Sequence, residues 1–200
     1  YFGNSTPPAY IGDLGDALSY NPTLAYSSTY YWQVIPYNNQ GDAANCPIWS
    51  FTTMADPTVM LPVAFDFTGT ATGAMPLGWE RSHANWGAVT TTNAGGSSPE
   101  LRMYWSPSTD ANVRAITPPL YGDNEDGYIL KFKHNVDHYS YGDPYTLNVE
   151  ISTDKANWTT LWSMVPTASV TAEVELPNNL GAYLEAPFYL AWTFDGNTYD

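Results

Sequence analysis

Two short segments near the start of the chain alternate between the two faces expected of a β-strand. In residues 29–34 (TYYWQV), Tyr30 and Trp32 occupy one set of alternate positions and Tyr31 and Gln33 the other. Residues 48–53 (IWSFTT) form a second such run. Because side chains in a strand point alternately to opposite faces, each run predicts a strand with one face on a core.

The rest of the chain predicts strands as well. Helical periodicity is nearly absent, and strand-like runs recur between clusters of Gly, Pro, Asn and Asp. From residue 61 onwards there are nine such runs, at 64–67, 78–80, 100–105, 113–119, 127–134, 145–152, 158–163, 170–176 and 188–195. The sequence therefore predicts an all-β fold of two tandem β-sandwiches.

The predicted domains are separated by a stretch without alternation. Residues 54–60 hold Pro57, and Pro62 follows closely, so the segment is interpreted as a short, fairly stiff linker. Residues 1–53 form the first predicted domain and residues 61–200 the second.

A spacing in the first domain matches a known side-chain motif. Leu24 lies six residues before Tyr30, as in a tyrosine corner, where the phenol packs in the sandwich and its hydroxyl bonds back to nearby backbone. The wider pattern is YFG, an Asn-Pro turn, LAYSSTYYWQV, N-x-x-G-D and WSFTT. This pattern resembles the C-terminal two-thirds of a fibronectin type III domain of bacterial surface proteins. The resemblance implies structural roles for Tyr30, Trp32 and Trp49, and it implies that the domain's first strands lie outside this sequence.

The second domain resembles a different family. It contains LPVAFDF, PLGW, AITPPL, YILKF, VEISTD-x-x-x-WTTLW and FYLAWTFDG. These pieces are similar to the jelly-roll modules called choice-of-anchor J or cleaved-adhesin domains, relatives of MAM-like sandwiches. The resemblance implies an extracellular module of a large protein, exported by type IX secretion in Bacteroidetes-like organisms and serving adhesion or substrate capture. It also implies a last strand after Asp200.

The net charge of the chain limits the kinds of molecule that it can bind. Six Lys and Arg stand against twenty Asp and Glu, a net charge of -14. Nucleic acid and anionic membranes need a basic surface, so they are excluded as partners, whereas cations and neutral sugars fit. No apolar run approaches the ~20 residues of a membrane span. Cys46 is the single cysteine, and its pairing stays open between a free buried thiol and a partner outside the sequence.

Acidic residues suggest a structural calcium site. Calcium takes about six to eight oxygen ligands, which loops at the ends of a sandwich can supply. Asp66 and Asp195 stand where related jelly rolls often place ligands, and Asp200 follows closely. The loop at residues 123–127 (DNEDG) is a second candidate, and plain solvated acids are the alternative.

One aromatic loop suggests a contact surface for glycan or protein. Residues 138–145 (HYSYGDPY) bring together His138, Tyr139, Tyr141 and Tyr145 around a Gly-Asp-Pro turn. A loop packed on itself is the alternative. Four tryptophans occupy the apolar positions of alternating runs and are predicted to lie in the core: Trp32, Trp49, Trp79 and Trp192.

The sequence contains no recognisable catalytic motif around its three histidines. His83, His134 and His138 stand in none of the usual hydrolase or metalloprotease motifs, and a zinc site from His134, Asp137 and His138 is a weaker alternative to ordinary loop hydrogen bonds. Glu150 is interpreted as the polar side of an ordinary strand. Residues 152–158 (STDKANW) approach an Asp-box but are one residue short, so a tight hairpin capped by Asp154 is predicted.

The sequence therefore predicts a secreted or cell-surface protein that is not an enzyme. Its function is adhesion or scaffolding within a larger multidomain protein or filament, with self-association through exchanged edge strands as a hypothesis. The first alternative is an accessory carbohydrate-binding module of a secreted hydrolase, and the second is an enzymatic jelly roll. Insertion into a membrane is not expected.

Overall fold

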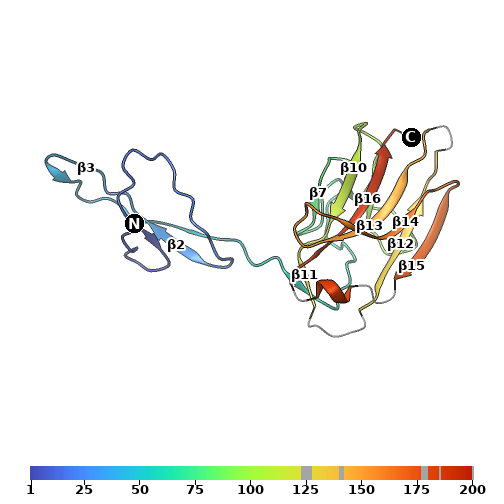
Figure 1. Ribbon diagram of the computed structural model, residues 1–200, viewed down its shortest axis with the longest axis horizontal. Helices are drawn as coiled ribbons and strands as arrows, with labels where there is room; N and C mark the ends of the chain where they lie inside the picture. Colours follow the sequence, from blue (N-terminus) through green and yellow to red (C-terminus); the bar gives the residue numbers. More distant parts are fainter. Residues whose placement is uncertain (123–127, 140–141, 177–179, 185, 200) are drawn as a thin grey trace. The chain divides into compact units, whose positions relative to one another are not determined.

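The computed structural model describes the chain except residues 123–127, 140–141, 177–179, 185 and 200 (Figure 1). The described residues divide into two compact units, Tyr1–Asp56 and Pro57–Asp200. The division falls inside the segment predicted as a linker, residues 54–60. Both units are built from strands, and the predicted all-β sandwich fold is confirmed.

The first unit contains one three-stranded antiparallel sheet in the order β1-β2-β5, and a separate hairpin. Its strands are β1 (Phe2–Gly3), β2 (Thr29–Trp32), β3 (Tyr37–Asn38), β4 (Gly41–Asp42) and β5 (Trp49–Thr52). The two alternating runs of the sequence are β2 and β5, and they pair directly. Tyr30 is buried, and its hydroxyl accepts a hydrogen bond from the backbone N–H of Ala25 at 2.9 Å, the bond that a tyrosine corner makes.

Trp32 and Trp49 differ from their expected place in the core. They lie opposite each other on β2 and β5 and stack with ring centroids 6.0 Å apart, but they are 38% and 55% exposed. All of residues 1–56 are described, and their strands form one three-stranded sheet and one hairpin. The two tryptophans are therefore not covered by a second sheet of this unit. The prediction of alternation was right, and the prediction of burial was wrong.

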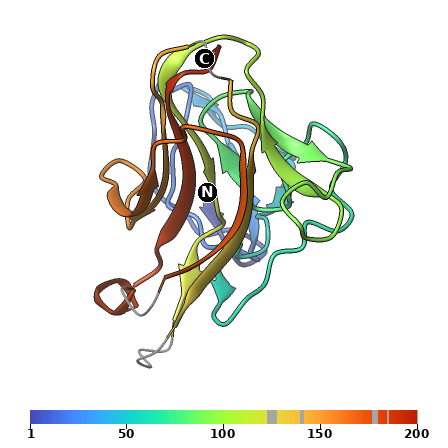
Figure 2. The same cartoon turned by 90° about the vertical axis from the view of Figure 1, so that its right-hand side faces the viewer.

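The second unit is a β-sandwich (Figure 2). Its elements are β6 (Val59–Met60), β7 (Glu80–Arg81), β8 (Trp86–Val89), β9 (Glu100–Met103), β10 (Asp110–Ile116), β11 (Leu120–Tyr121), β12 (Leu130–Val136), β13 (Thr146–Ser152), β14 (Thr159–Met164), β15 (Val170–Leu176), η1 (Gly181–Tyr183) and β16 (Tyr189–Asn197). Five strands form the main sheet in the order β14-β13-β16-β10-β7. β12 pairs with β15, β8 with β9, and β6 with β11.

Alternating side chains of the main sheet build the core. Val113, Val149 and Phe194 come from three neighbouring strands and are buried on the same face. The ring of Phe132 on β12 packs edge-on to Trp192 of this sheet, with centroids 5.8 Å apart. The β12–β15 pair therefore covers the main sheet as part of the second layer.

Two segments form other structures than predicted. Residues 64–67 were expected to be a strand, but Phe67 has a φ of 57°, in the left-handed region, and the segment joins no ladder. Its rings still reach the core, where Phe67 packs edge-on to Trp79. Val59–Met60, expected in the linker, forms β6 because the backbone of β11 offers a parallel partner. In the part of the chain that the structure describes, no helix is long and apolar enough to cross a membrane.

Candidate functional site

The main sheet carries a polar surface on the side opposite the core. Two rows of residues cross β10, β16 and β13 in register, and we call them the polar sheet face. The first row is Asn112, Asp195 and Thr146, and the second is Arg114, Thr193 and Asn148. Residues directly opposite on neighbouring strands have Cβ atoms about 5 Å apart, so these side chains form one continuous surface.

This surface is open at one end. Asn112 and Asp195 are exposed, and Thr146 and Asn148 are partly exposed. Ser163 of β14 extends the second row beyond Asn148 and is exposed as well. The first row and this extension are therefore accessible to a ligand.

An ion pair lies at the other end. The carboxylate of Glu150, a residue only 7% exposed, accepts hydrogen bonds from Arg114 Nε at 2.8 Å and Arg114 Nη2 at 3.4 Å. The hydroxyl of Thr193 donates to the same carboxylate. These contacts hold the guanidinium of Arg114 in one plane at this end of the polar sheet face.

The ion pair of Arg114 and Glu150 was not predicted from the sequence. The sequence placed Glu150 correctly on the polar side of a strand, but it did not predict its burial or its partner. A signal was present, because Arg114 and Glu150 are single charges of opposite sign in two otherwise uncharged strand segments, 111–119 and 144–152. Lone charges in apolar strands are costly unless they pair.

The hairpin at residues 152–158 closes this end of the surface. Asp154 Oδ1 accepts hydrogen bonds from the backbone N–H groups of Asn157 and Ala156, both at 2.8 Å, and Asp154 Oδ2 accepts one from the Asn157 side chain. Asn157, through its backbone and side-chain donors, and then Ala156 hold the pKa of Asp154 well below its usual 3.8. The predicted hairpin capped by Asp154 is confirmed.

Trp158 at the end of this hairpin faces the polar surface. Its ring lies against the guanidinium of Arg114, 5.2 Å from the ring centroid, and its Nε1 donates to the carbonyl of Lys155. Lys155 in turn pairs with Glu80 of β7 at 3.0 Å. Trp162 points the other way and packs on Phe132 in the core. The hairpin thus forms a wall across the strands at one edge of the polar sheet face.

The predicted aromatic loop is only partly a surface. Tyr145 is 6% exposed and stacks on Phe194 with centroids 4.8 Å apart, so the prediction that it contacts a ligand was wrong. Tyr145 precedes β13 and lies on the same side of the sheet as Leu147 and Val149 of that strand, which faces the core. Its hydroxyl shares a 3.1 Å hydrogen bond with His138 Nδ1, and burial, followed by the charge of Asp137, raises the pKa of the phenol. Tyr139 is exposed, and Tyr141 lies outside the described residues.

Two of the predicted calcium ligands, Asp66 and Asp195, have different local environments. Asp66 Oδ1 accepts a hydrogen bond from the backbone N–H of Thr68 at 3.0 Å, and this bond, then the Thr68 hydroxyl, lowers the pKa of Asp66. Asp195 stands on β16 between Asn112 and Thr146. Asp200 and the 123–127 loop lie outside the described residues. Among the residues that are described, no three His, Cys, Asp or Glu side chains gather to hold a metal, and the calcium site stays a prediction.

The two histidines of the zinc alternative make separate contacts. His134 packs against the rings of Phe132 and Trp162, and burial lowers the pKa of its imidazole. His138 bonds to Tyr145 in the loop that follows. The two imidazoles thus have different neighbours: His134 contacts core aromatic rings, and His138 contacts the Tyr145 hydroxyl.

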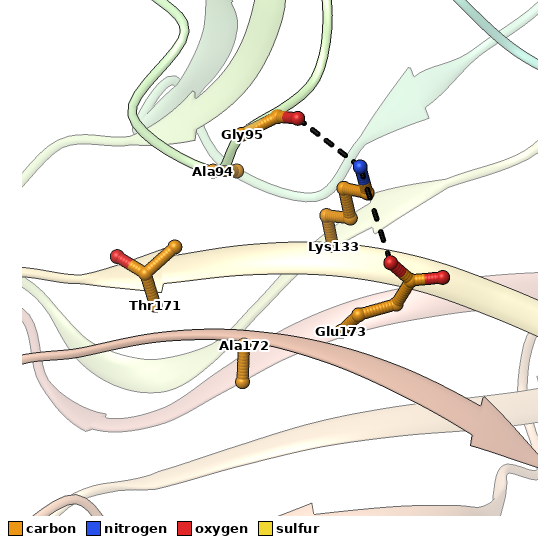
Figure 3. Close-up of a pocket in the computed structure, with 6 residues that line it drawn as sticks. All are labelled: Ala94, Gly95, Lys133, Thr171, Ala172 and Glu173. Atoms are coloured by element: carbon orange, nitrogen blue, oxygen red, sulfur yellow. Dashed lines mark hydrogen bonds and ion pairs between the residues drawn. The ribbon is translucent and has the colours of Figure 1, made fainter.

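A shallow hollow of about 220 Å³ lies on the other layer of the sandwich, between residues 94–95 and the β12–β15 pair (Figure 3). Lys133 Nζ donates to the carbonyl of Gly95 at 3.1 Å and lies 3.9 Å from Glu173. Glu100 holds the same loop by accepting hydrogen bonds from the backbone of Asn93 and Ala94. These contacts hold the loop at residues 94–95 against the β12–β15 pair. The Lys133 ammonium and the Gly95 carbonyl are already bonded to each other, so few polar groups are left for a ligand.

The chain was compared with protein families, curated proteins and solved structures. No family model matches the chain, and no curated protein matches it. Among solved structures, the chain is similar to one described as "Structural basis for the promiscuous specificity of the carbohydrate-binding modules from the beta-sandwich super family". The two share 15% identity over 85% of this chain and 68% of that one, with a TM-score of 0.32. A likeness of this size identifies no ligand for the present chain, and the fibronectin type III and choice-of-anchor J resemblances stay predictions.

Proposed function

We propose that the chain is a non-catalytic, extracellular adhesion segment of a larger surface protein, and that its second unit attaches to glycans through the polar sheet face. The observation that carries this proposal is the row of Asn112, Asp195 and Thr146, which crosses three neighbouring strands in register and is open to solvent. Sugar hydroxyls both donate and accept hydrogen bonds. Planar amides and carboxylates on a rigid sheet are suited to bind them.

The amides of this surface support the proposal. No hydrogen bond within the described part of the chain uses the side-chain amide of Asn112 or Asn148. Polar side chains that a protein uses for its own stability are usually bonded to backbone or to each other, as Asn85 and Asn135 are here. Two amides directed at solvent from a rigid sheet are the arrangement expected of a recognition surface.

The position of the acids supports a role without catalysis. Glycoside hydrolysis needs two carboxylates about 5 to 10 Å apart, one of them able to give and take a proton. Glu150 is engaged by Arg114 and Thr193, and Glu80 is paired with Lys155, so Asp195 has no second unpaired acid beside it in the two rows. The chemistry that remains at the open end is hydrogen bonding to a ligand.

A glycan array, followed by titration of any glycan that binds, tests this proposal. The matched variant is Asn112→Ala/Asn148→Ala, and the control is Asn135→Ala, which removes an amide from the outer side of β12. We expect the double variant to lose at least about tenfold in affinity, a difference of roughly 1.4 kcal/mol, and the control to bind as the parent chain does. Binding to no glycan would contradict the proposal, as would equal affinities for all three proteins.

A structural role in self-association is a second candidate, favoured by the first unit. Trp32 and Trp49 are exposed side by side, and β5 pairs with a neighbour on one side only. An exposed apolar strand at a sheet edge is a template for pairing with another chain. Electron microscopy of the native material distinguishes the roles, because this one requires continuous filaments and the adhesion role does not.

The calcium site is proposed as a structural addition to either role. Titration with calcium, read as heat and as a rise in melting temperature, tests it directly. The variant Asp195→Asn is expected to abolish the effect, and the absence of any effect in the parent chain would remove the site.

A further inference from the structure

Resting on the proposed function, we infer that the ligand of the polar sheet face is an uncharged glycan of about three sugar units, lying across the strands rather than along them. The class, length and direction of the ligand follow from three separate features: the charges of the face, the number of strands it crosses, and the wall that ends it.

The charges of the face favour a neutral sugar. The positive charge of Arg114 is balanced by Glu150 at 2.8 Å, and that of Lys155 by Glu80 at 3.0 Å. Asp195 then remains as an exposed acid of the face. In the calcium-free chain, a uronate or sulfate group would meet this carboxylate without a compensating cation among the described side chains of the face, within a chain of net charge -14.

The width of the face sets the length of the ligand. The accessible residues run from Asn112 on β10 and Asp195 on β16 to Asn148 on β13 and Ser163 on β14, so they cross four adjacent strands. Neighbouring strands lie about 4.8 Å apart, so the accessible residues span about 14 Å. This is the length of a trisaccharide.

The hairpin sets the direction of the ligand. Trp158 and Lys155 stand over the ends of the strands at Arg114 and Glu80, which blocks a ligand that runs parallel to β13 and β16 toward that edge. The opposite edge, at Asn112 and Asp195, is open. A chain of sugars lying across the strands contacts the first row together with Asn148 and Ser163, and it passes beside this wall.

The side chains then have distinct roles. Asn112 and Asn148 each offer a donor and an acceptor, and Asp195 accepts from sugar hydroxyls. Arg114, whose side chain is only 17% exposed and lies against Trp158, closes the covered end of the face, where Glu150 holds its guanidinium.

Titration with a matched series of glycans tests the inference. In the presence of a calcium chelator, the 200-residue chain is titrated with neutral oligosaccharides of increasing length from the polymer that binds best, and with their uronate or sulfated counterparts. We expect affinity to rise up to about three units and then level off, and each acidic counterpart to bind at least about tenfold more weakly. In Asp195→Asn this penalty should shrink, whereas in the control Glu175→Gln, which makes the same charge change on β15, it should not.

The outcomes separate this inference from the proposed function. If acidic glycans bind as well as neutral ones, and Asn112→Ala/Asn148→Ala removes that binding, the neutral ligand is wrong and the glycan surface stands. If affinity keeps rising well beyond three units, the direction across the strands is wrong. If neither series binds, the proposed function and this inference both fail.

Discussion

Arg114 and Glu150 form a two-point ion pair that spans the strand between them. Arg114 belongs to β10 and Glu150 to β13, and both side chains reach over β16, where the Thr193 hydroxyl completes the network. The pair ties three strands together on the side of the sheet that faces solvent, at the base of the proposed glycan surface. Its side chains are only 17% and 9% exposed, so solvent screens it weakly.

Removing one member of this pair should be strongly destabilising. In Glu150→Ala, Arg114 keeps its charge but loses its partner in a largely buried place, and we expect a loss of about 3 kcal/mol in the free energy of unfolding. Urea denaturation of the whole chain measures it. Glu175→Ala breaks the exposed pair with Lys131 and serves as the control, for which a much smaller change is expected. Equal losses in the two variants would show that the burial of the pair has no energetic consequence.

Gly87 should not tolerate a side chain. A Cβ at this position of β8 would lie 2.8 Å from the carbonyl oxygen of Gly73, and backbone atoms cannot move aside as a flexible side chain can. We expect Gly87→Ala to lower the free energy of unfolding by about 2 kcal/mol. In Gly96→Ala, where nothing lies within 4 Å of the new atom, the change should stay within about 0.5 kcal/mol. Thermal and urea unfolding compare them, and a neutral Gly87→Ala would contradict the close approach of the two segments.

Tyr145 should affect stability and leave ligand binding unchanged. Tyr145→Phe removes the hydrogen bond to His138 but keeps the stacking on Phe194, so a loss of about 1 kcal/mol is expected. Tyr145→Ala also removes the buried ring and should cost about 4 kcal/mol. If Tyr145→Phe instead weakened glycan binding without changing the unfolding curve, Tyr145 would be a ligand contact after all.

The hairpin wall should weaken in acid. The pKa of Asp154 is lowered in the folded chain, so its ionised form stabilises the fold at pH values above the ordinary 3.8. This contribution is lost progressively as the pH falls below that value toward the folded pKa. We expect the melting temperature of the parent chain to fall from about pH 5 to about pH 2.5 more steeply than that of Asp154→Asn, which has no charge to lose. Parallel curves for the two proteins would mean that the bonds of Asp154 do not stabilise the fold.

Much of the fold was predictable because strand periodicity is a local property. The alternation in residues 145–152 and 170–176 gave β13 and β15 almost to the residue. Short strands such as β8 and β11 were missed, since two to four residues carry too little alternation to be recognised. The run at 64–67 was expected as a strand because it alternates, but Phe67 has a left-handed backbone and its ring packs on Trp79, a contact that local alternation does not encode.

The candidate site was less predictable because it depends on which strands become neighbours. Asn112, Asp195 and Thr146 lie far apart in the sequence and meet only through the register of β10, β16 and β13. Asp195 was singled out as a metal ligand, without its neighbours. Local bonding, by contrast, was predictable, as the hairpin capped by Asp154 shows.

Glycan binding at the polar sheet face is the central claim, and mapping by nuclear magnetic resonance tests it most directly. The chain, labelled with ¹⁵N, is titrated with a neutral trisaccharide from the best-binding polymer. We predict that the backbone and side-chain amide signals of Asn112 and Asn148 shift, together with the backbone signals of Thr146 and Asp195, while those of Asn135 on the other layer stay in place. Shifts centred on Tyr139 or on the Trp32–Trp49 pair, or no shifts at saturating sugar, would contradict it.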